Sequence, residues 1–176
     1  MFKNRSKQII TIAALVTALT LLVAVLAYLN AGDLDRKKTL EKDAEFVLRY
    51  GEKEHRVSRE AIVDLGTVEF STVMRTSSTA PTHVTFTGVE LWKILERYEI
   101  PIQADSMVDV KALDGYVSVF DGEEVLERDS VYLTIAMNGE PLQTKSEGGQ
   151  GPFYLVLRNT EFAQRWVKFV EEIFVQ

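Results

Sequence analysis

The longest apolar run of the chain lies near its N-terminus, over residues 9–29. It contains no charged residue, no proline and no glycine. At a rise of ~1.5 Å per residue, a helix of this length covers the ~30 Å hydrocarbon core of a bilayer. The pattern therefore predicts one transmembrane helix.

Three basic residues and no acidic residue precede this run, at Lys3, Arg5 and Lys7. By the positive-inside rule, residues 1–8 form a cytoplasmic leader, and the rest of the chain lies on the extracytoplasmic side of the cell membrane as a single-pass protein. A cleaved signal peptide is the alternative. The run exceeds the ~7–15 residues usual for a signal peptide, and the small-residue site at 29–31 begins with a bulky leucine, so the pattern favours an uncleaved signal-anchor.

A polar, charge-mixed segment at 30–44 follows and is expected to be a tether or a continuation of the helix. After it, short apolar or alternating runs predict strands, and glycine-containing turns at 51–54, 114–115 and 138–139 predict hairpins. The expected strands are 46–50, 55–57, 68–74, 83–86, 108–113, 116–120, 131–137, 153–157 and 166–175. A Ser/Thr-rich loop is expected at 76–79.

Two helices are predicted among these strands. Ser58 is a suitable N-cap for a short helix that Gly66 closes. A second helix is expected over 89–98, where apolar residues recur at steps of three and four. With more strands than helices and mostly antiparallel hairpins, residues 45–176 are predicted to form one α+β domain, a strand-rich mixed sheet domain.

Composition excludes several functions. The formal net charge is −6, and without the leader's three basic residues it is about −9, which argues against a nucleic-acid partner. The chain has no cysteine, so it has no disulfide, no thiolate metal ligand and no cysteine nucleophile. With two histidines, His55 and His83, a multi-histidine zinc site is excluded as well.

The glycine-rich segment 147–152 is the most unusual local sequence. Its three glycines allow close backbone approach to a ligand, and successive amides can bind an anion, although the segment taken by itself favours a structural bend. The segment lacks the lysine and serine of a P-loop and does not match a dinucleotide fingerprint. The acidic residues of 121–129 lack the spacing of a calcium loop and are interpreted as a solvated helix face.

Five short motifs occur in an order that is similar to a known family. They are 86–91 followed by Ile94-Leu95, then 112–116, then 138–142, then 148–152, and finally 166–168 with Ile173. In this order, over about residues 46–175, they resemble the oxidoreductase molybdopterin-binding domain, which has the sulfite oxidase-like fold. The resemblance implies a strand-rich α+β fold, a molybdenum-pterin cofactor and two-electron oxygen-atom chemistry.

Two departures from the family's pattern concern the cofactor. The family's molybdenum-ligating cysteine would fall in 70–74, which has none, and the family's arginine after Gly-Pro is replaced by Tyr154. Lys168 matches the family's lysine near the closing strand. The resemblance thus implies a pocket in which glycine amides and the lysine receive an anionic group. Its residues would be Asp114, Gly115, Tyr116, Gly148, Gly149, Gly151 and Lys168.

Three functions follow as hypotheses. The first is a membrane-anchored, non-catalytic module that binds a pterin, another small anionic ligand or an envelope protein. The second is an active molybdopterin-dependent oxidoreductase that holds its metal through the pterin dithiolene alone and exchanges electrons with a membrane partner. The third is a purely structural partner of an envelope protein, for which an exposed apolar patch is the expected sign. A polar, basic-rimmed cleft would instead favour the first.

Overall fold

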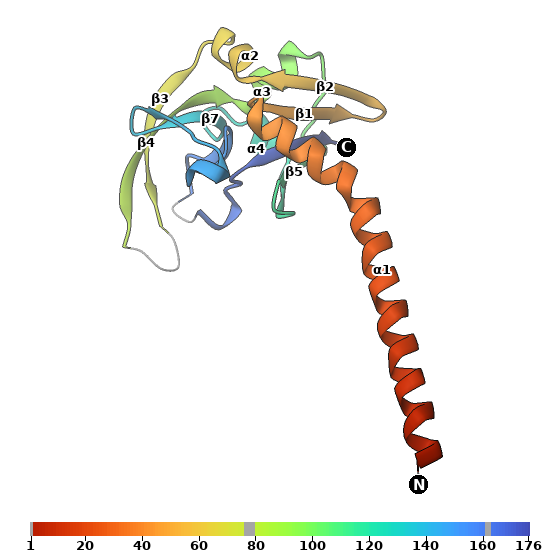
Figure 1. Cartoon of the computed structure of the whole chain (residues 1–176). Coiled ribbons are helices and arrows are strands. Elements are labelled where there is room, and N and C mark those ends of the chain that lie inside the picture. The colour runs from red at the N-terminus through yellow and green to blue at the C-terminus, as the bar shows by residue number, and fades with distance from the viewer. Residues whose placement is uncertain (1, 76–79, 161–162) are drawn as a thin grey trace. The chain divides into compact units, whose positions relative to one another are not determined.

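The computed structural model describes the backbone of residues 2–75, 80–160 and 163–176, and side chains from residue 10 onward within these ranges. The leader's side chains and the predicted loop 76–79 lie outside the described residues. The chain divides into two compact units, one ending at Lys38 and one over Thr39–Gln176 (Figure 1).

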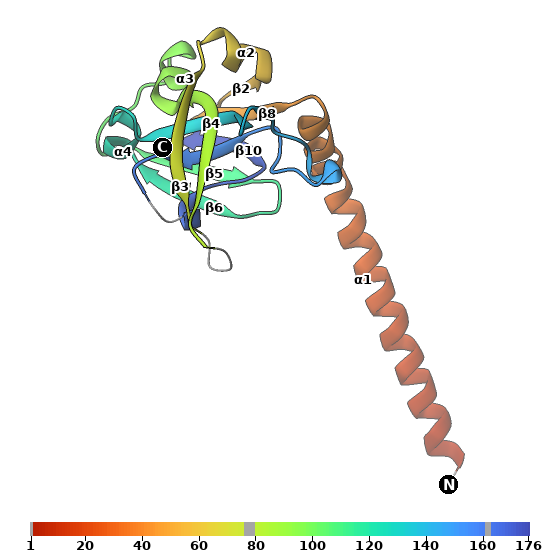
Figure 2. The same cartoon turned by 90° about the vertical axis from the view of Figure 1, so that its left-hand side faces the viewer.

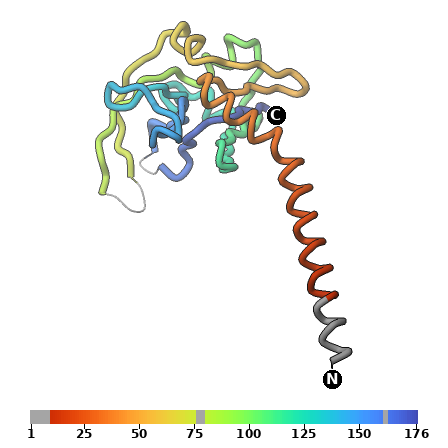
Figure 3. Tube along the Cα trace, in the orientation of Figure 1, coloured from red at the N-terminus to blue at the C-terminus, as the bar shows by residue number. Residues whose placement is uncertain are grey.

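The apolar run belongs to one long helix, α1 (Phe2–Lys42), traced as an unbroken coil in Figure 3. Its part from Ile10 onward is long and apolar enough to cross a membrane, and the apolar side chains are exposed. The charged segment after the run is helical as well, because it contains no proline, and Lys37 pairs with Asp33 one turn earlier at 3.3 Å. Of the two expected states of 30–44, the structure shows the helical one up to Lys42.

The second unit contains two five-stranded sheets, and its strands match the hairpin prediction closely (Figure 2). The first sheet has the order β2-β1-β10-β5-β6 and consists of β1 (Glu45–Tyr50), β2 (Lys53–Ser58), β5 (Met107–Ala112), β6 (Val117–Asp121) and β10 (Val170–Val175). Only the pair β1–β10 is parallel among the described strands. The closing strand begins later than predicted, because Phe169 has a positive φ of 54° that interrupts the extended backbone.

The second sheet has the order β3-β4-β7-β8, and β9 also pairs with β7. Its strands are β3 (Val68–Met74), β4 (Thr82–Glu90), β7 (Val131–Met137), β8 (Glu140–Pro141) and β9 (Tyr154–Leu157). The expected alternation is present, with Val84 and Phe86 buried and His83 exposed. The two sheets enclose one core, in which Phe46 of β1 meets Phe153, just before β9, edge to face at 5.0 Å.

Three short α-helices complete the unit: α2 (Arg59–Asp64), α3 (Leu91–Arg97) and α4 (Gly122–Leu126). The predicted cap of α2 is confirmed, since the Ser58 hydroxyl accepts the amide of Ala61 at 3.3 Å. Helix α3 starts two residues later than predicted because Val89 and Glu90 still pair with β7. The α+β, strand-rich prediction is therefore confirmed.

A half-buried cation organises the loop between β8 and β9. The guanidinium of Arg59 donates to the carbonyls of Ile135 (2.7 Å), Leu142 (3.1 Å) and Pro152 (3.3 Å). Burial lowers the pKa of Arg59, but a guanidinium remains charged at neutral pH. One side chain thus holds both ends of the glycine-rich loop against β7.

The same loop is tied to the end of α1. Within the second unit, the Glu41 carboxylate accepts the amide of Lys145, the first residue of the 3₁₀ helix η1 (Lys145–Glu147). Thr144 and Glu147 form a capping box at this turn. Further along, Gly151 has φ +89° and lies so close to Phe169 that an added Cβ would be 2.6 Å from the Phe169 Cα.

Replacing Arg59 tests the first of these constraints. We expect Arg59→Met to lower the free energy of unfolding by about 2 kcal/mol, because three carbonyls lose a charged donor. Arg56→Met is the matched control: it removes an exposed arginine whose ion pair with Glu45 spans 3.7 Å, and we expect a change below about 0.5 kcal/mol. Urea unfolding of both variants measures the difference, and equal midpoints would contradict the role given to Arg59.

Two glycines with the same φ separate backbone strain from crowding. Gly115 and Gly151 both have φ +89°, but a Cβ on Gly115 would meet nothing within 4 Å. We expect Gly115→Ala to cost about 1 kcal/mol of strain and Gly151→Ala about 2 kcal/mol more, from overpacking against Phe169. Thermal unfolding of the two variants side by side checks this order, and a Gly115→Ala effect equal to that of Gly151→Ala would disprove it.

Candidate functional site

A pocket of about 300 Å³ opens where the predicted motifs converge. Its walls come from the end of β3, the β5–β6 turn, the end of β7, the start of β9 and the segment 163–169. Three of the predicted site residues, Asp114, Tyr116 and Lys168, line it. The pocket therefore brings together residues that lie more than 50 positions apart in the chain.

Aromatic side chains form much of this pocket. Tyr154 is 2% exposed, and its ring meets Trp166 at 6.0 Å and Phe86 at 5.7 Å, edge to face in both cases. Burial raises the pKa of the Tyr154 hydroxyl, which therefore stays neutral. Where the resemblance implied an arginine, the pocket thus has an uncharged phenol within an aromatic cluster.

Phe169 provides another aromatic wall in a strained conformation. A bulky residue rarely adopts a positive φ, and here the backbone is held on both sides. The Phe169 amide donates to the Gln150 carbonyl, and the Phe169 carbonyl accepts the Leu113 amide, both at 2.9 Å. These bonds join the glycine-rich loop and the β5–β6 turn at the pocket, so its shape is set by backbone contacts.

The pocket has few polar groups, and its two charged side chains, Lys168 and Asp114, have opposite charges. Lys168 has its Nζ 6.0 Å from the Tyr154 ring centre and has no ion pair among the described residues. Asp114 uses Oδ1 to accept the Tyr116 amide at 3.0 Å, and the Tyr116 hydroxyl donates to the Gln164 carbonyl at 2.7 Å. The site thus offers one ammonium group and one carboxylate, and it is not the basic-rimmed cleft that the sequence analysis considered.

The amides of the four predicted glycines are hydrogen-bonded to carbonyls of nearby turns. Gly148 and Gly149 line a second hollow of about 260 Å³, which shares Met137 and Gln150 with the first. Their amides donate to the carbonyls of Lys145 and Thr144, at 3.1 and 2.9 Å. The amides of Gly151 and Gly115 donate to Gln143 and Ala112, at 2.8 and 2.9 Å. These amides therefore close the chain's own turns, and the anion-binding role expected of the glycines stays a prediction.

The available donors do not fit protein-ligated molybdenum. The chain has no cysteine, and from the stretch 70–74, where the thiolate was expected, Met74 reaches the pocket. A neutral thioether does not replace an anionic thiolate as a ligand. Among the described residues, no group of three His, Cys, Asp or Glu side chains is arranged to hold a metal.

Several pocket residues were not predicted from the sequence, namely Met74, Met137, Gln150, Trp166 and Phe169. Trp166 belongs to a matched motif, but the motif alone does not indicate that its ring lines a pocket. Met74 and Met137 end two strands of the second sheet, and nothing in their local sequence distinguishes them from core methionines. Their position became evident only when the strands were placed in the sheet.

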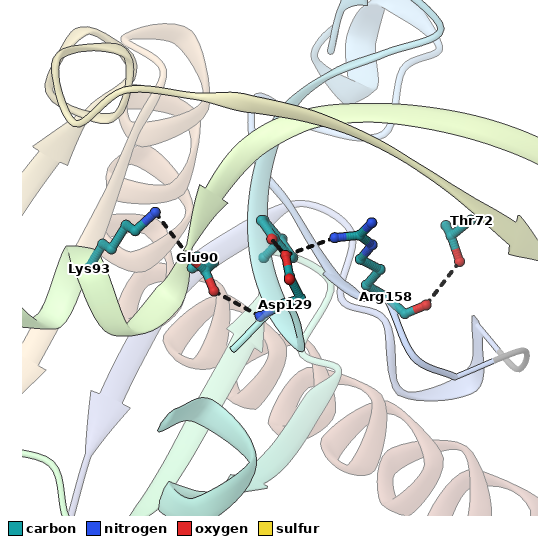
Figure 4. A network of polar contacts seen from close by, with 6 residues as sticks. Thr72, Glu90, Lys93, Asp129 and Arg158 are labelled. Atoms are coloured by element: carbon teal, nitrogen blue, oxygen red, sulfur yellow. Dashed lines mark hydrogen bonds and ion pairs between the residues drawn. The ribbon is translucent and has the colours of Figure 1, made fainter. Parts of the chain in front are cut away.

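A polar network that the sequence analysis also missed lies beside β7 (Figure 4). Glu90, 7% exposed, accepts the Asp129 amide at 2.8 Å and pairs with Lys93 at 2.9 Å. Asp129 accepts the Tyr132 hydroxyl at 2.7 Å and pairs with Arg158 at 2.8 Å. Burial, followed by the hydrogen bond to Asp129, raises the pKa of Tyr132 to about 12. The network ties the start of α3 to β7 and to the chain after β9, so we interpret it as structural.

A comparison with known protein families gave a match. The family model described as the oxidoreductase molybdopterin binding domain matches residues 37–176, which include both sheets and the pocket. The comparison with curated proteins gave no match. Since the family match covers well over half of the chain, the chain belongs to the oxidoreductase molybdopterin binding domain family, as a member without a cysteine to ligate molybdenum.

Proposed function

We propose that the protein is a membrane-anchored, non-catalytic binding module whose pocket takes a pterin-type anionic ligand on the extracytoplasmic side. The observation that carries the proposal is the combination found in the pocket. Lys168, Asp114 and a set of aromatic walls surround one hollow, while the chain has no thiolate. The family match suggests a pterin as the class of ligand. The side chains of the pocket suggest that the pterin part of the family's cofactor is bound and that the metal is not.

The recognition chemistry suits a flat heteroaromatic ring with an acidic substituent. Phe169 is partly exposed and offers an apolar ring surface for stacking, while the buried rings of Tyr154 and Trp166 line the pocket. Lys168 provides a charge for a phosphate or carboxylate. The Asp114 oxygen that does not bind Tyr116 can accept ring N–H groups.

The pocket size agrees with a small ligand. A hollow of about 300 Å³ is at the lower end of the ~300–1,000 Å³ typical of ligand sites. It suits one pterin-sized group. When bound, a complete molybdenum cofactor would supply redox chemistry, but this chain contributes no soft anionic ligand to hold the metal.

The membrane part of the proposal rests on α1. The apolar run spans a bilayer by length, and the basic leader favours a cytoplasmic N-terminus. A second basic group, Arg36-Lys37-Lys38, follows the run at its other end. Because the rule compares the two flanks, a direct measurement of the orientation tests this part of the proposal.

Cofactor analysis of the full-length chain tests the ligand proposal. The protein is purified from membranes of a host that makes molybdenum cofactor, assayed for molybdenum by elemental analysis and for pterin by fluorescence after oxidation. We expect pterin without near-stoichiometric molybdenum. We also expect Lys168→Met to lower the retained pterin by about tenfold, through loss of its charge contact. The control Lys53→Met removes an exposed lysine in β2 and leaves retention unchanged.

The other outcomes are equally informative. Near-stoichiometric molybdenum would overturn the non-catalytic assignment and make the chain an oxidoreductase. Well-folded protein with neither pterin nor metal would reject the pterin-type ligand. Equal losses in the Lys168 and Lys53 variants would show that Lys168 does not contact the ligand.

Fusions at the C-terminus test the orientation. Gln176 is exposed, so a reporter can follow it without disturbing the core. We expect alkaline phosphatase, which is active only outside the cytoplasm, to be active in this fusion, and the full-length anchored product to remain in the membrane fraction. Inactive phosphatase at normal protein levels would place the domain in the cytoplasm, and release of a shorter soluble product would indicate a cleaved signal peptide.

A further inference from the structure

One face of the folded unit has an unusual concentration of exposed apolar side chains. In the second unit, eight large apolar side chains are exposed among the described residues. Four of them, Met107, Val117, Val119 and Leu126, lie on β5, β6 and the adjoining α4. We call this set the β6 face. Figure 2 shows its two strands side by side.

The strand register places Met107, Val117 and Val119 on one side of the sheet, together with Asp109 and Lys111 of β5. In β6, Ser118 and Phe120 point into the core, so Val117 and Val119 lie on the opposite side, 46% and 42% exposed. Met107 is on the same side, because it pairs with Asp121, two residues beyond Val119. A solvated sheet face normally has polar residues at such positions.

The edge of β6 is fixed by the chain itself. Arg165 donates to the Val119 carbonyl at 2.9 Å and forms two 2.8 Å bonds with the Glu124 carboxylate. Its guanidinium also lies over the Phe120 ring, 4.8 Å from the ring centre. The strand is therefore preformed, which lowers the entropy cost of docking a partner on its face.

Acidic residues border the β6 face. An open groove of about 760 Å³ beside Leu126 is lined by Asp121, Glu123 and Glu127, in addition to the paired Glu124 and Arg165. None of these three carboxylates has an ion pair among the described residues. An apolar strip beside free negative charge is complementary to a segment that combines apolar and basic side chains.

From this geometry we propose that the β6 face is the docking surface for a partner protein with a basic, amphipathic segment. Apolar side chains of the partner cover Met107, Val117, Val119 and Leu126, and its lysines or arginines face Asp121, Glu123 and Glu127. A second copy of the chain is disfavoured, because it would bring two identical acidic rims together. An anionic lipid surface is disfavoured for the same reason. The surface is separate from the ligand pocket and does not depend on its contents.

Peptide binding tests the surface on the full-length chain in nanodiscs of phosphatidylcholine. The probe is a fluorescein-labelled amphipathic peptide of leucine and lysine, and its counterpart has glutamate in place of lysine. We expect the lysine peptide to bind with an affinity that falls as salt rises, and the glutamate peptide not to bind. Val117→Thr with Val119→Thr keeps shape and strand propensity, and it should weaken binding by about tenfold. Val63→Thr with Val68→Thr is the matched control, exposed elsewhere, with no effect expected.

The charges are tested separately. Asp121→Asn, Glu123→Gln and Glu127→Gln together should weaken binding and flatten its salt dependence. As the control, three charges are removed at the exposed residues Glu52, Glu69 and Glu140. This should change neither the affinity for the peptide nor the salt dependence of binding. Equal effects in both charge sets, or in both valine sets, would show non-specific attraction to an acidic protein and overturn the proposal.

Crosslinking in native membranes identifies the partner. A photoreactive benzoylphenylalanine is placed at Val119, with Val68 as the control position. The expected product joins position 119, and not 68, to a protein at a peptide in which lysine or arginine alternates with apolar residues. Adducts of 119 with a second copy of the chain or with lipid, or adducts no more abundant than those of 68, would contradict the assignment.

Discussion

The contact between Arg59 and three backbone carbonyls is the constraint on which the site depends. The guanidinium binds Ile135, Leu142 and Pro152, so it holds both ends of the glycine-rich loop to the second sheet. Between these anchors the loop's amides bond to its own carbonyls, and Gly151 lies in close contact with Phe169. These contacts help to place Gln150 and Phe169 at the pocket. The Glu41 carboxylate, which accepts the Lys145 amide, also ties the end of α1 to this loop.

The pocket combines a family scaffold with a changed set of donors. Tyr154 stands where a charged side chain was expected, and its ring packs edge to face with Trp166 and Phe86. Met74 reaches the pocket from the stretch in which a thiolate was expected. Both changes replace ionic groups by polarizable apolar ones, which favours stacking of a flat ring and disfavours metal ligation. In the proposed function, the ammonium group of Lys168 is the main means of selecting an anionic ligand.

The β5–β6 hairpin contributes to two surfaces with different chemistry. At its turn, Asp114 and Tyr116 line the pocket, and a few residues later Val117 and Val119 form the exposed β6 face. Two neighbouring residues contact both surfaces. The Gln164 carbonyl accepts the Tyr116 hydroxyl, and the Arg165 guanidinium donates to the Val119 carbonyl. One hairpin therefore contributes both to the candidate ligand pocket and to the proposed docking surface.

Local sequence was sufficient for most elements of this fold, because their causes are local. A charge-free run makes α1, Ser58 caps α2, and Asp114-Gly115 turns β5 into β6. The order of the motifs, which include Lys168, was sufficient to predict the family. The tertiary structure alone decided the site: long-range pairing brought Met74, Met137 and Phe169 to one pocket. It also showed that the glycine amides are used within the loop, since hydrogen-bond partners depend on how the chain closes on itself. Likewise, the alternation in β6 predicts two faces, but only packing determines which face is left uncovered.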